Sequence, residues 1–351
     1  MRARKLSLVA VAALLLASTL AMAGTIHAPW PSDWNNVSDP NMWCMVGDVG
    51  NVAYTGDPNV PGGSVGSVAY EYKIGKFEVT AGAYTAFLNA VAATDTYGLY
   101  NTAMGTDGNK CNITRSGSDG SYTYTAGSAN KPVNFVGWRD AVRYVNWLTN
   151  GQLTGAQDAN TTETGSYNLV GLTDEAGWMA VTRIAEGDRV AGKSYFFIPN
   201  ENEFVKAAHY DKNKSGGAGY YMYETLSDSV PGVTQDGGGT NVANFKLSTT
   251  VPITVVGEFE SAVGPYGTFD MGGNVREWTE GINIFNGPPP SRALRGGGFS
   301  EGETSLRITK RDGKPTTWEE SKSGFRIVEI PEPATMSLLV LGGLAMLRRR
   351  K

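Results

Sequence analysis

The stretch FDMGGNVREW, residues 269–278, holds the residue types in this chain that are best suited to chemistry. Its two carboxylates, Asp270 and Glu277, are separated by a Gly-Gly-Asn turn. Calcium takes about six to eight oxygen ligands, which it draws from carboxylates and from backbone carbonyls at a bend. The segment therefore predicts a calcium site. A catalytic acid pair and a surface hairpin that binds no ion are the two alternatives.

Other motifs that would indicate an enzyme are missing from the sequence. It has no paired-cysteine motif, and RGGGF at 295–299 lacks the Lys-Ser/Thr ending of a phosphate loop. The only histidines are His27 and His209, and we expect His209 to end a helix, where the helix dipole favours its charge. The only cysteines, Cys44 and Cys111, could pair in an oxidising compartment, but their spacing does not decide it.

The N-terminus predicts export. Basic residues at the start precede the apolar run 6–20, and Ala21-Met22-Ala23 fits the small-x-small pattern of a signal peptidase site. We therefore expect residues 1–23 to be a secretory signal peptide that signal peptidase removes. A membrane anchor is the alternative, although the run is short of the ~20 apolar residues that a span needs.

The C-terminus combines Pro331-Glu332-Pro333, an apolar run over 334–347 and the basic cluster 348–351. A basic cluster of this kind stays on the cytoplasmic side of a membrane. The three parts, in this order, resemble the PEP-CTERM sorting signal of Gram-negative bacteria, here residues 330–351. The resemblance implies transient membrane contact, cleavage by an exosortase, and passage through the periplasm to the cell surface or extracellular matrix. An ordinary tail anchor is the alternative.

The bulk composition limits the function classes. The chain has 351 residues, a net charge of −4 and an isoelectric point of about 5.4, so nothing indicates nucleic-acid binding. Its 45 glycines and its 18% of charged residues are typical of a loop-rich protein with little regular helix. Polar stretches over 95–130, 151–192 and 211–241 predict long loops.

Local patterns predict the elements that must position these residues. In YEYKIGKFEVT, residues 70–80, apolar and charged residues alternate as in a half-buried strand, and Thr80 can then cap a helix. A second helix is predicted over 137–149. A third begins at Asn200, where Glu203 completes a capping box.

The rest of the chain completes a single predicted domain. Residues 250–328 read as short strands separated by glycine turns. We therefore expect one domain over 68–328, preceded by an N-terminal lead-in over 24–67.

Four segments, taken in order, resemble the sulfatase-modifying-factor family, which comprises the formylglycine-generating-enzyme-like domains. They are IGKFEVTAGAYTAFLNAV, KPVNFVGWRDAVRYVNWL, FFIPNENEFVKAA, and the series FDMGGNVREWTE, RALRGGGFS and SGFRIV. The resemblance covers about residues 68–328. It implies an α+β fold of the C-type-lectin-like kind, with little regular secondary structure.

The resemblance also implies which chemistry is lost. Formylglycine-generating enzymes oxidise a substrate cysteine with two copper-binding cysteines, which lie between the Arg-Gly-Gly and Gly-Phe-Arg motifs. Here that interval, 299–322, has no cysteine, and Glu303 and Ile308 fall near the expected positions. Without thiolates a soft copper(I) site cannot form, so copper is not expected. A related branch of the family uses three histidines to bind iron, and this chain has two.

For calcium, the resemblance supports the site predicted from the residues. It implies a structural ion held by the side chains of Asp270 and Glu277 and by the carbonyls of Gly273 and Val275. A second family calcium site begins at an Asn-hydrophobic pair, matched here by Asn244 and Phe245. Its later aspartate has no clear match in LSTTVPITVV, so this second site lacks one of the family's ligands.

Two function classes stay open. The first is an exported, non-catalytic surface or matrix protein whose loops bind a polysaccharide or a peptide. The second is an enzyme of the formylglycine-generating or a related oxidoreductase superfamily with divergent chemistry. The lack of a thiol pair and the shortage of histidines favour the first class.

Overall fold

The structure is a computed structural model that describes residues 36–233, 239–246, 252–283 and 290–330. The predicted signal peptide, 1–23, and all but the first residue of the predicted sorting segment, 330–351, lie outside the described residues. Short helices and strands are separated by long loops, so the chain is an α+β protein with modest regular secondary structure, as its composition predicts.

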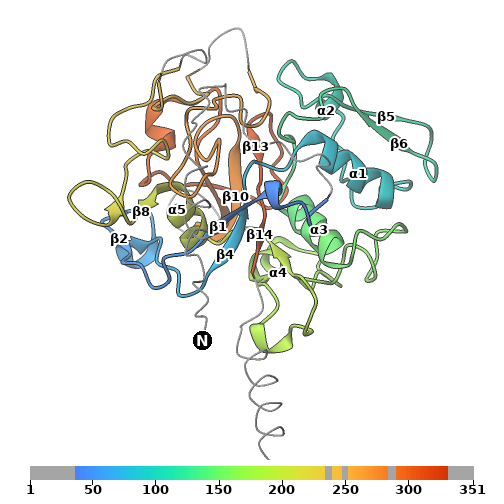
Figure 1. Ribbon diagram of the computed structural model, residues 1–351. Coiled ribbons are helices and arrows are strands. Elements are labelled where there is room, and N and C mark those ends of the chain that lie inside the picture. Colours follow the sequence, from blue (N-terminus) through green and yellow to red (C-terminus); the bar gives the residue numbers. More distant parts are fainter. Residues whose placement is uncertain (1–35, 234–238, 247–251, 284–289, 331–351) are drawn as a thin grey trace, which may run out of the picture.

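A four-stranded antiparallel sheet runs through the middle of the molecule (Figure 1). Its strands, in spatial order, are β1 (Trp43–Val46), β4 (Tyr72–Gly75), β14 (Val328–Glu329) and β7 (Phe196–Phe197). β4 confirms the strand predicted from the alternation in YEYKIGKFEVT, and its Tyr72 and Ile74 are fully buried. β1 comes from the segment expected as a lead-in, so that segment contributes a strand to the main sheet.

A second four-stranded sheet is built from the C-terminal part of the chain. Its spatial order is β12 (Asp312–Lys314), β11 (Ser291–Arg295), β10 (Arg276–Asn283) and β13 (Ser323–Gly324). β10 and β13 run parallel, and the other neighbours are antiparallel. The short strands predicted between 250 and 328 are thereby confirmed, and FDMGGNVREW leads directly into β10.

The three predicted helices are present as α1 (Ala81–Val91), α3 (Trp138–Thr149) and α5 (Glu201–His209). The Thr80 hydroxyl accepts the backbone N–H of Ala83, as expected of a helix cap. Asn200 accepts the N–H of Glu203, whose carboxylate accepts the N–H of Asn200, so the predicted capping box is confirmed. Two short helices, α2 (Ala103–Thr106) and α4 (Glu175–Ala180), were not predicted.

Within the described residues, small hairpins lie outside the two four-stranded sheets. The two-stranded pairs are β2 (Tyr54–Thr55) with β3 (Ser64–Val65), β5 (Ile113–Ser116) with β6 (Thr123–Ala126), and β8 (Tyr210–Asp211) with β9 (Gly219–Tyr220). The second of these pairs lies within 95–130, which the composition had indicated to be loop.

One large hydrophobic core joins the two sheets to the helices on one side of them, α1 and α3 (Figure 1). Two fully buried tryptophans tie α3 to β10: the Trp138 indole N–H donates to the carbonyl of Thr279, and that of Trp278 donates to the carbonyl of Val136. Each indole thus buries its large apolar ring without leaving its N–H unpaired. β10, which carries part of the predicted calcium segment, is therefore anchored to α3 and to the residues just before it.

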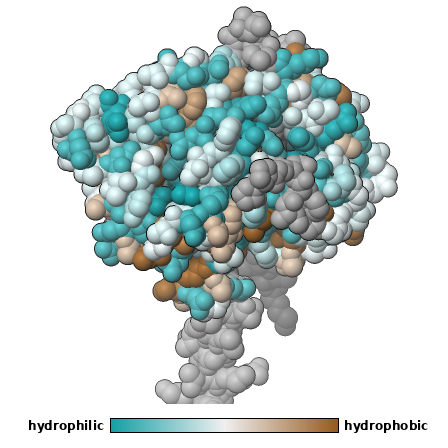
Figure 2. Space-filling model, turned by 180° about the vertical axis from the view of Figure 1, so that it is seen from behind, coloured by the Kyte–Doolittle hydropathy of each residue, from teal (hydrophilic) through white to brown (hydrophobic). Residues whose placement is uncertain are grey.

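The face of the molecule seen from behind is mainly polar. Figure 2 shows hydrophilic and near-neutral residues over most of the face seen from behind, with hydrophobic residues gathered at its lower edge. No helix within the described residues combines the length and the apolar character that crossing a membrane would require.

Candidate functional site

The predicted calcium segment forms a tight turn at the start of β10. Asp270, Gly273 and Asn274 all have positive φ, at 55°, 88° and 52°. A side chain at Gly273 would collide with the carbonyl of Asn244, so only glycine fits there. The Asn274 N–H donates to that same carbonyl at 2.8 Å. The structure therefore brings Asn244, the first residue of the second predicted calcium site, against the turn of the first.

Asn244 and Phe245 are both engaged with the protein. The Asn244 amide donates to the carbonyl of Pro252 at 3.2 Å and to the side-chain oxygen of Asn274 at 3.3 Å. The Phe245 ring is buried in a small apolar cluster with Tyr223 and Leu306. These contacts show where the two residues lie, and calcium binding by them stays a prediction.

The two predicted carboxylates lie in different hydrogen-bonding environments. Glu277 is fully buried, and both of its oxygens accept hydrogen bonds from the Arg326 guanidinium, at 2.6 and 2.7 Å. Asp270 is half-buried, and its Oδ2 accepts the backbone N–H of Gly257 at 2.6 Å. Burial raises the pKa of Asp270 to about 6, although the nearby charge of Arg326 acts to lower this pKa. Burial also raises the pKa of Glu277.

A third carboxylate, Glu78, belongs to this group and was not singled out from the sequence. It is 2% exposed, and neither of its oxygens has a hydrogen-bond partner. Burial, followed by repulsion from Asp270, raises its pKa well above the usual range, while Arg326 works in the opposite direction. Its place in the segment IGKFEVT, one of the four that carry the family resemblance, was the signal that could have pointed to it.

The interval where copper-binding cysteines would lie is occupied by ion pairs and apolar packing. Ile308 is buried against Val65 and Val205. Glu201 accepts from Arg295 at 2.9 Å and from Arg311 at 2.7 Å. Polar side chains do converge there, but they satisfy one another, which is typical of a structural ion network.

The two cysteines are unsuited to redox chemistry. Cys44 and Cys111 are both free and buried, so the disulfide that the sequence left open is not formed. Burial raises the pKa of each thiol to about 11. Both sulfurs are therefore protonated near neutral pH, and neither is a ready nucleophile or copper ligand. Within the described residues, no three His, Cys, Asp or Glu side chains form a set that could hold a metal ion.

His209 ends α5 as predicted, but its environment excludes the predicted charge. It is 4% exposed, and burial, aided by the charge of Arg295, lowers its pKa to about 3. The ring is therefore neutral at neutral pH, and the expected stabilisation of a charged His209 by the helix dipole is wrong.

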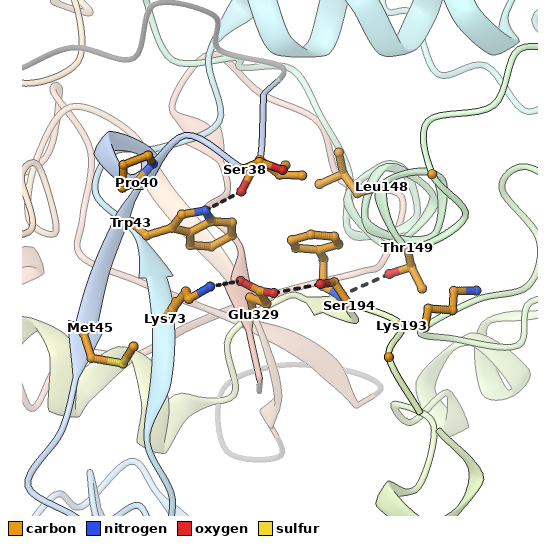
Figure 3. A pocket seen from close by; sticks show the side chains of 14 residues that line it. Ser38, Pro40, Trp43, Met45, Lys73, Leu148, Thr149, Lys193, Ser194 and Glu329 are labelled. Carbon is orange, nitrogen blue, oxygen red and sulfur yellow. Dashed lines mark hydrogen bonds and ion pairs between the residues drawn. The ribbon is translucent and has the colours of Figure 1, made fainter. Parts of the chain in front are cut away.

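A pocket of about 820 Å³ lies against the sheet formed by β1, β4, β14 and β7, between these strands and the C-terminal end of α3 (Figure 3). All four strands contribute to it, since β1 gives Trp43, β4 gives Lys73, β7 gives Phe196 and β14 gives Glu329. The sequence did not single out this pocket, because its residues are distributed over most of the chain.

The pocket combines aromatic rings with a row of polar groups. The rings of Trp43 and Phe196 stack with centroids 5.9 Å apart and planes 18° apart. The Glu329 carboxylate accepts from the Lys73 ammonium at 2.7 Å and from the Ser194 hydroxyl at 2.9 Å, as Figure 3 shows. The carboxylate is thus oriented and charge-balanced. An aromatic surface beside oriented polar groups suits a ligand that is apolar on one face and hydroxylated at its edges.

Comparisons with known proteins agree with this architecture. A protein-family model described as "Sulfatase-modifying factor enzyme 1-like domain" matches residues 46–330, and a model of the PEP-CTERM protein-sorting motif matches residues 329–351. No curated protein sequence matches the chain.

Among solved structures, similar ones include Treponema denticola variable protein 1, with 18% identity, a TM-score of 0.47, and coverage of 82% of this chain and 95% of that one. CarF has 20% identity, a TM-score of 0.47, and coverage of 82% and 98%. PvdO from Pseudomonas aeruginosa has 18% identity, a TM-score of 0.43, and coverage of 82% and 90%.

Proposed function

Since the chain belongs to the sulfatase-modifying factor enzyme 1-like family, we propose that it is a non-catalytic member that binds a saccharide of the extracellular polymer in the pocket of Trp43 and Glu329. The sorting motif marks it as an exported protein of a Gram-negative bacterium and as a substrate for an exosortase. Signal peptidase cleavage after residue 23, transient membrane contact and final residence at the cell surface or in the matrix are part of the same proposal.

The observation that carries the proposal is the composition of the pocket. A pyranose ring has an apolar face, which stacks on an aromatic ring, and hydroxyl edges, which take paired donors and acceptors. Trp43 offers the ring, and Glu329 with Ser194 offers an acceptor beside a hydroxyl. The volume lies within the range of roughly 300–1,000 Å³ that is usual for small-molecule sites. An extended peptide is the competing ligand.

Loss of Trp43 should abolish most of the affinity for saccharide fragments. Trp43→Ala removes the stacking surface, and we expect the Kd to rise about ten- to a hundredfold, since aromatic anchors contribute roughly 1.4–2.8 kcal/mol. Glu329→Gln should weaken binding by about tenfold, because a charge-assisted acceptor is lost. Calorimetric titration with fragments of the host's own extracellular polysaccharide measures both effects.

Trp318→Ala is the matched control, because Trp318 is 41% exposed and does not line the pocket. Its affinity should equal that of the wild type. Saturable binding of peptides with no binding of any saccharide fragment would overturn the proposal, and so would equal losses in the Trp43 and Trp318 variants.

Family-type oxidation is not part of the proposed function. We expect no aldehyde when the mature chain is incubated with a sulfatase-motif peptide, copper and oxygen. The reason is that 299–322 offers no thiol and that both cysteines lie elsewhere, buried and protonated. Aldehyde detected with a hydrazide probe, in proportion to protein and lost in a Cys44→Ser or Cys111→Ser variant, would establish the alternative, an enzyme with divergent chemistry.

A structural calcium ion is also part of the proposal. The four groups that the family resemblance implies are Asp270, Glu277 and the carbonyls of Gly273 and Val275. Glu78 supports a cation there, because its buried carboxylate has no hydrogen-bond partner beside Asp270. The calcium ion would share the Glu277 carboxylate with Arg326, which is possible because a carboxylate has about four lone-pair sites. Bound calcium would supply charge neutralisation and hold the turn; copper is not expected. Calcium content per chain, measured by atomic emission after equilibration with calcium and dialysis, tests it: the wild type should retain the ion and Asp270→Asn should lose it. A wild type that retains no calcium would contradict the site.

A further inference from the structure

The pocket of Trp43 and Glu329 lies at the point where the C-terminal tail, residues 331–351, leaves the domain. Glu329 is the last residue of β14 and lines the pocket, and the sorting motif begins at this same residue. The apolar run of the tail starts at Ala334. Because a chain spans at most about 3.6 Å per residue, Glu329 lies within about 18 Å of that first apolar residue. The pocket therefore stays close to any membrane that the tail enters.

The length of the apolar run brings the domain closer still. The fourteen residues 334–347 supply about 21 Å of helix, at about 1.5 Å per residue. The hydrocarbon core of a bilayer is about 30 Å thick, and the basic cluster 348–351 holds one end of the run at the cytoplasmic surface. The shortfall of about 9 Å is met by thinning of the bilayer and by drawing in the residues on the domain side. The domain is thereby pulled onto the lipid headgroups.

The rim of the pocket carries apolar side chains that the fold leaves uncovered. Met45, on β1, lines the pocket and is 52% exposed. Val190 is 62% exposed, and its carbonyl accepts the backbone N–H of Lys193, a second lining residue, at 3.2 Å. This tight turn places Val190 beside the pocket. Scattered exposed apolar side chains need no explanation, but these two belong to the rim from which the tail departs.

The charge of the rim differs in sign from that of the whole chain. The charged residues that line the pocket are Lys73, Lys193 and Glu329, which give a net charge of +1, whereas the chain carries −4. Both lysines are partly exposed. Lysines set among exposed apolar side chains suit a surface of anionic phospholipid, because the ammonium groups meet phosphates while the apolar groups reach the acyl boundary.

We propose that the rim of this pocket is a membrane-docking surface while the tail is uncleaved, and that phospholipid headgroups close the pocket until an exosortase removes the tail. The proposal rests on the proposed saccharide pocket and on the proposed membrane contact of the tail. It adds an order of events, since the protein binds saccharide only after its release. Polymer in the periplasm then cannot hold the uncleaved protein at the membrane.

The accessibility of single thiols tests the docking. The protein with its tail intact is reconstituted into vesicles of phosphatidylethanolamine and phosphatidylglycerol, and a membrane-impermeant maleimide is added. Ser38→Cys places a thiol on the exposed rim, and Ser118→Cys places one on the exposed turn between β5 and β6, well away from β14 (Figure 1). Cys44 and Cys111 react slowly, because they are buried and protonated. The ratio of the Ser38→Cys rate to the Ser118→Cys rate cancels differences in how the protein is oriented in the vesicles.

A lengthened tether provides the matched comparison. About thirty Gly and Ser residues inserted after Ile330 span roughly 30 Å on average, which frees the domain from the membrane surface. We expect the labelling ratio to be at least about tenfold lower with the native tether than with the inserted linker. Equal ratios in the two proteins would overturn the proposal.

A substitution at the rim tests the docking surface itself. Met45→Glu puts a charge where lipid contact is proposed, so it should raise the labelling ratio severalfold with the native tether and leave it unchanged with the linker. Val230→Glu is the control, because Val230 is 49% exposed and does not line the pocket, and its ratio should match that of the unsubstituted protein. A Met45→Glu ratio equal to the control would overturn the rim as the docking surface.

Calorimetric titration of the linker protein with saccharide fragments keeps the two proposals apart. If that protein binds saccharide while the rim thiol is never protected, the proposed function stands and the docking is overturned. If the rim thiol is protected while no saccharide binds, the docking stands and the saccharide pocket is overturned.

Discussion

Replacing Arg326 by methionine is expected to lower the free energy of unfolding by about 3–5 kcal/mol, the usual cost of removing one partner of a buried ion pair. Arg326 is fully buried, and its guanidinium donates to Glu277 through two nitrogens. It also donates to the carbonyls of Gly75 and Phe269, at 2.9 and 3.0 Å. The variant would leave Glu277 without its charge partner and two buried carbonyls without donors.

Urea unfolding, followed by tryptophan fluorescence, measures this loss as a shift in midpoint at constant slope. Lys73→Met is the control, since the Lys73–Glu329 pair is partly exposed and such pairs are worth about 0–1 kcal/mol. A double variant, Arg326→Met with Glu277→Gln, should recover part of the stability, because the uncompensated charge is removed. If Arg326→Met lowers the free energy of unfolding no more than Lys73→Met does, the buried Arg326–Glu277 pair does not stabilise the fold as expected.

Acidification should destabilise the wild type more than a His209→Gln variant, by about 1.4 kcal/mol for each pH unit below 6.5. The pKa of His209 is about 3 in the folded protein and ordinarily 6.5. Below pH 6.5 the unfolded chain therefore takes up a proton that the folded chain refuses until about pH 3. The stabilisation is complete above pH 6.5 and is lost as the pH falls through this window.

The quantity to compare is the difference in free energy of unfolding between the two proteins at each pH, because other groups change the stability in the opposite direction. The pKa values of Glu224 and Asp270 are raised to about 8 and 6, so those carboxyls stabilise the folded state as the pH falls. Their contributions cancel when the variant is subtracted. Thermal or urea unfolding in calcium-free buffer at several pH values between 7.5 and 4.5 gives the two curves. Parallel curves would show that His209 does not stay neutral.

The parts of the fold that the sequence predicted are those that local chemistry determines. α1, α3 and α5 were found because capping groups such as Thr80 and the pair of Asn200 and Glu203 act within a few residues of one another. The hairpin β5–β6 was missed because most of its residues are polar and its two strands are short. These residues form strands because they pair with one another, which their composition does not reveal.

The site residues were predictable only where a motif carried them. Asp270 and Glu277 lie in one continuous turn, so their spacing was visible. Nothing local indicates that Arg326 pairs with Glu277 across 49 residues, or that the buried Glu78 lies beside Asp270. The helix end at His209 was predicted correctly, but its burial depends on tertiary packing, so its charge was not.

The short strand β14 has a mechanical consequence. It contains only Val328 and Glu329, it lies inside the sheet between β4 and β7, and the sorting motif at residues 329–351 begins within it. Any tension applied to the C-terminal tail therefore enters the domain through β14. Two paired residues can bear little shear, so much of the load passes to the side-chain links from Glu329 to Lys73 and Ser194. A pulling force on the tail would thus act first on the pocket residues Lys73, Ser194 and Glu329.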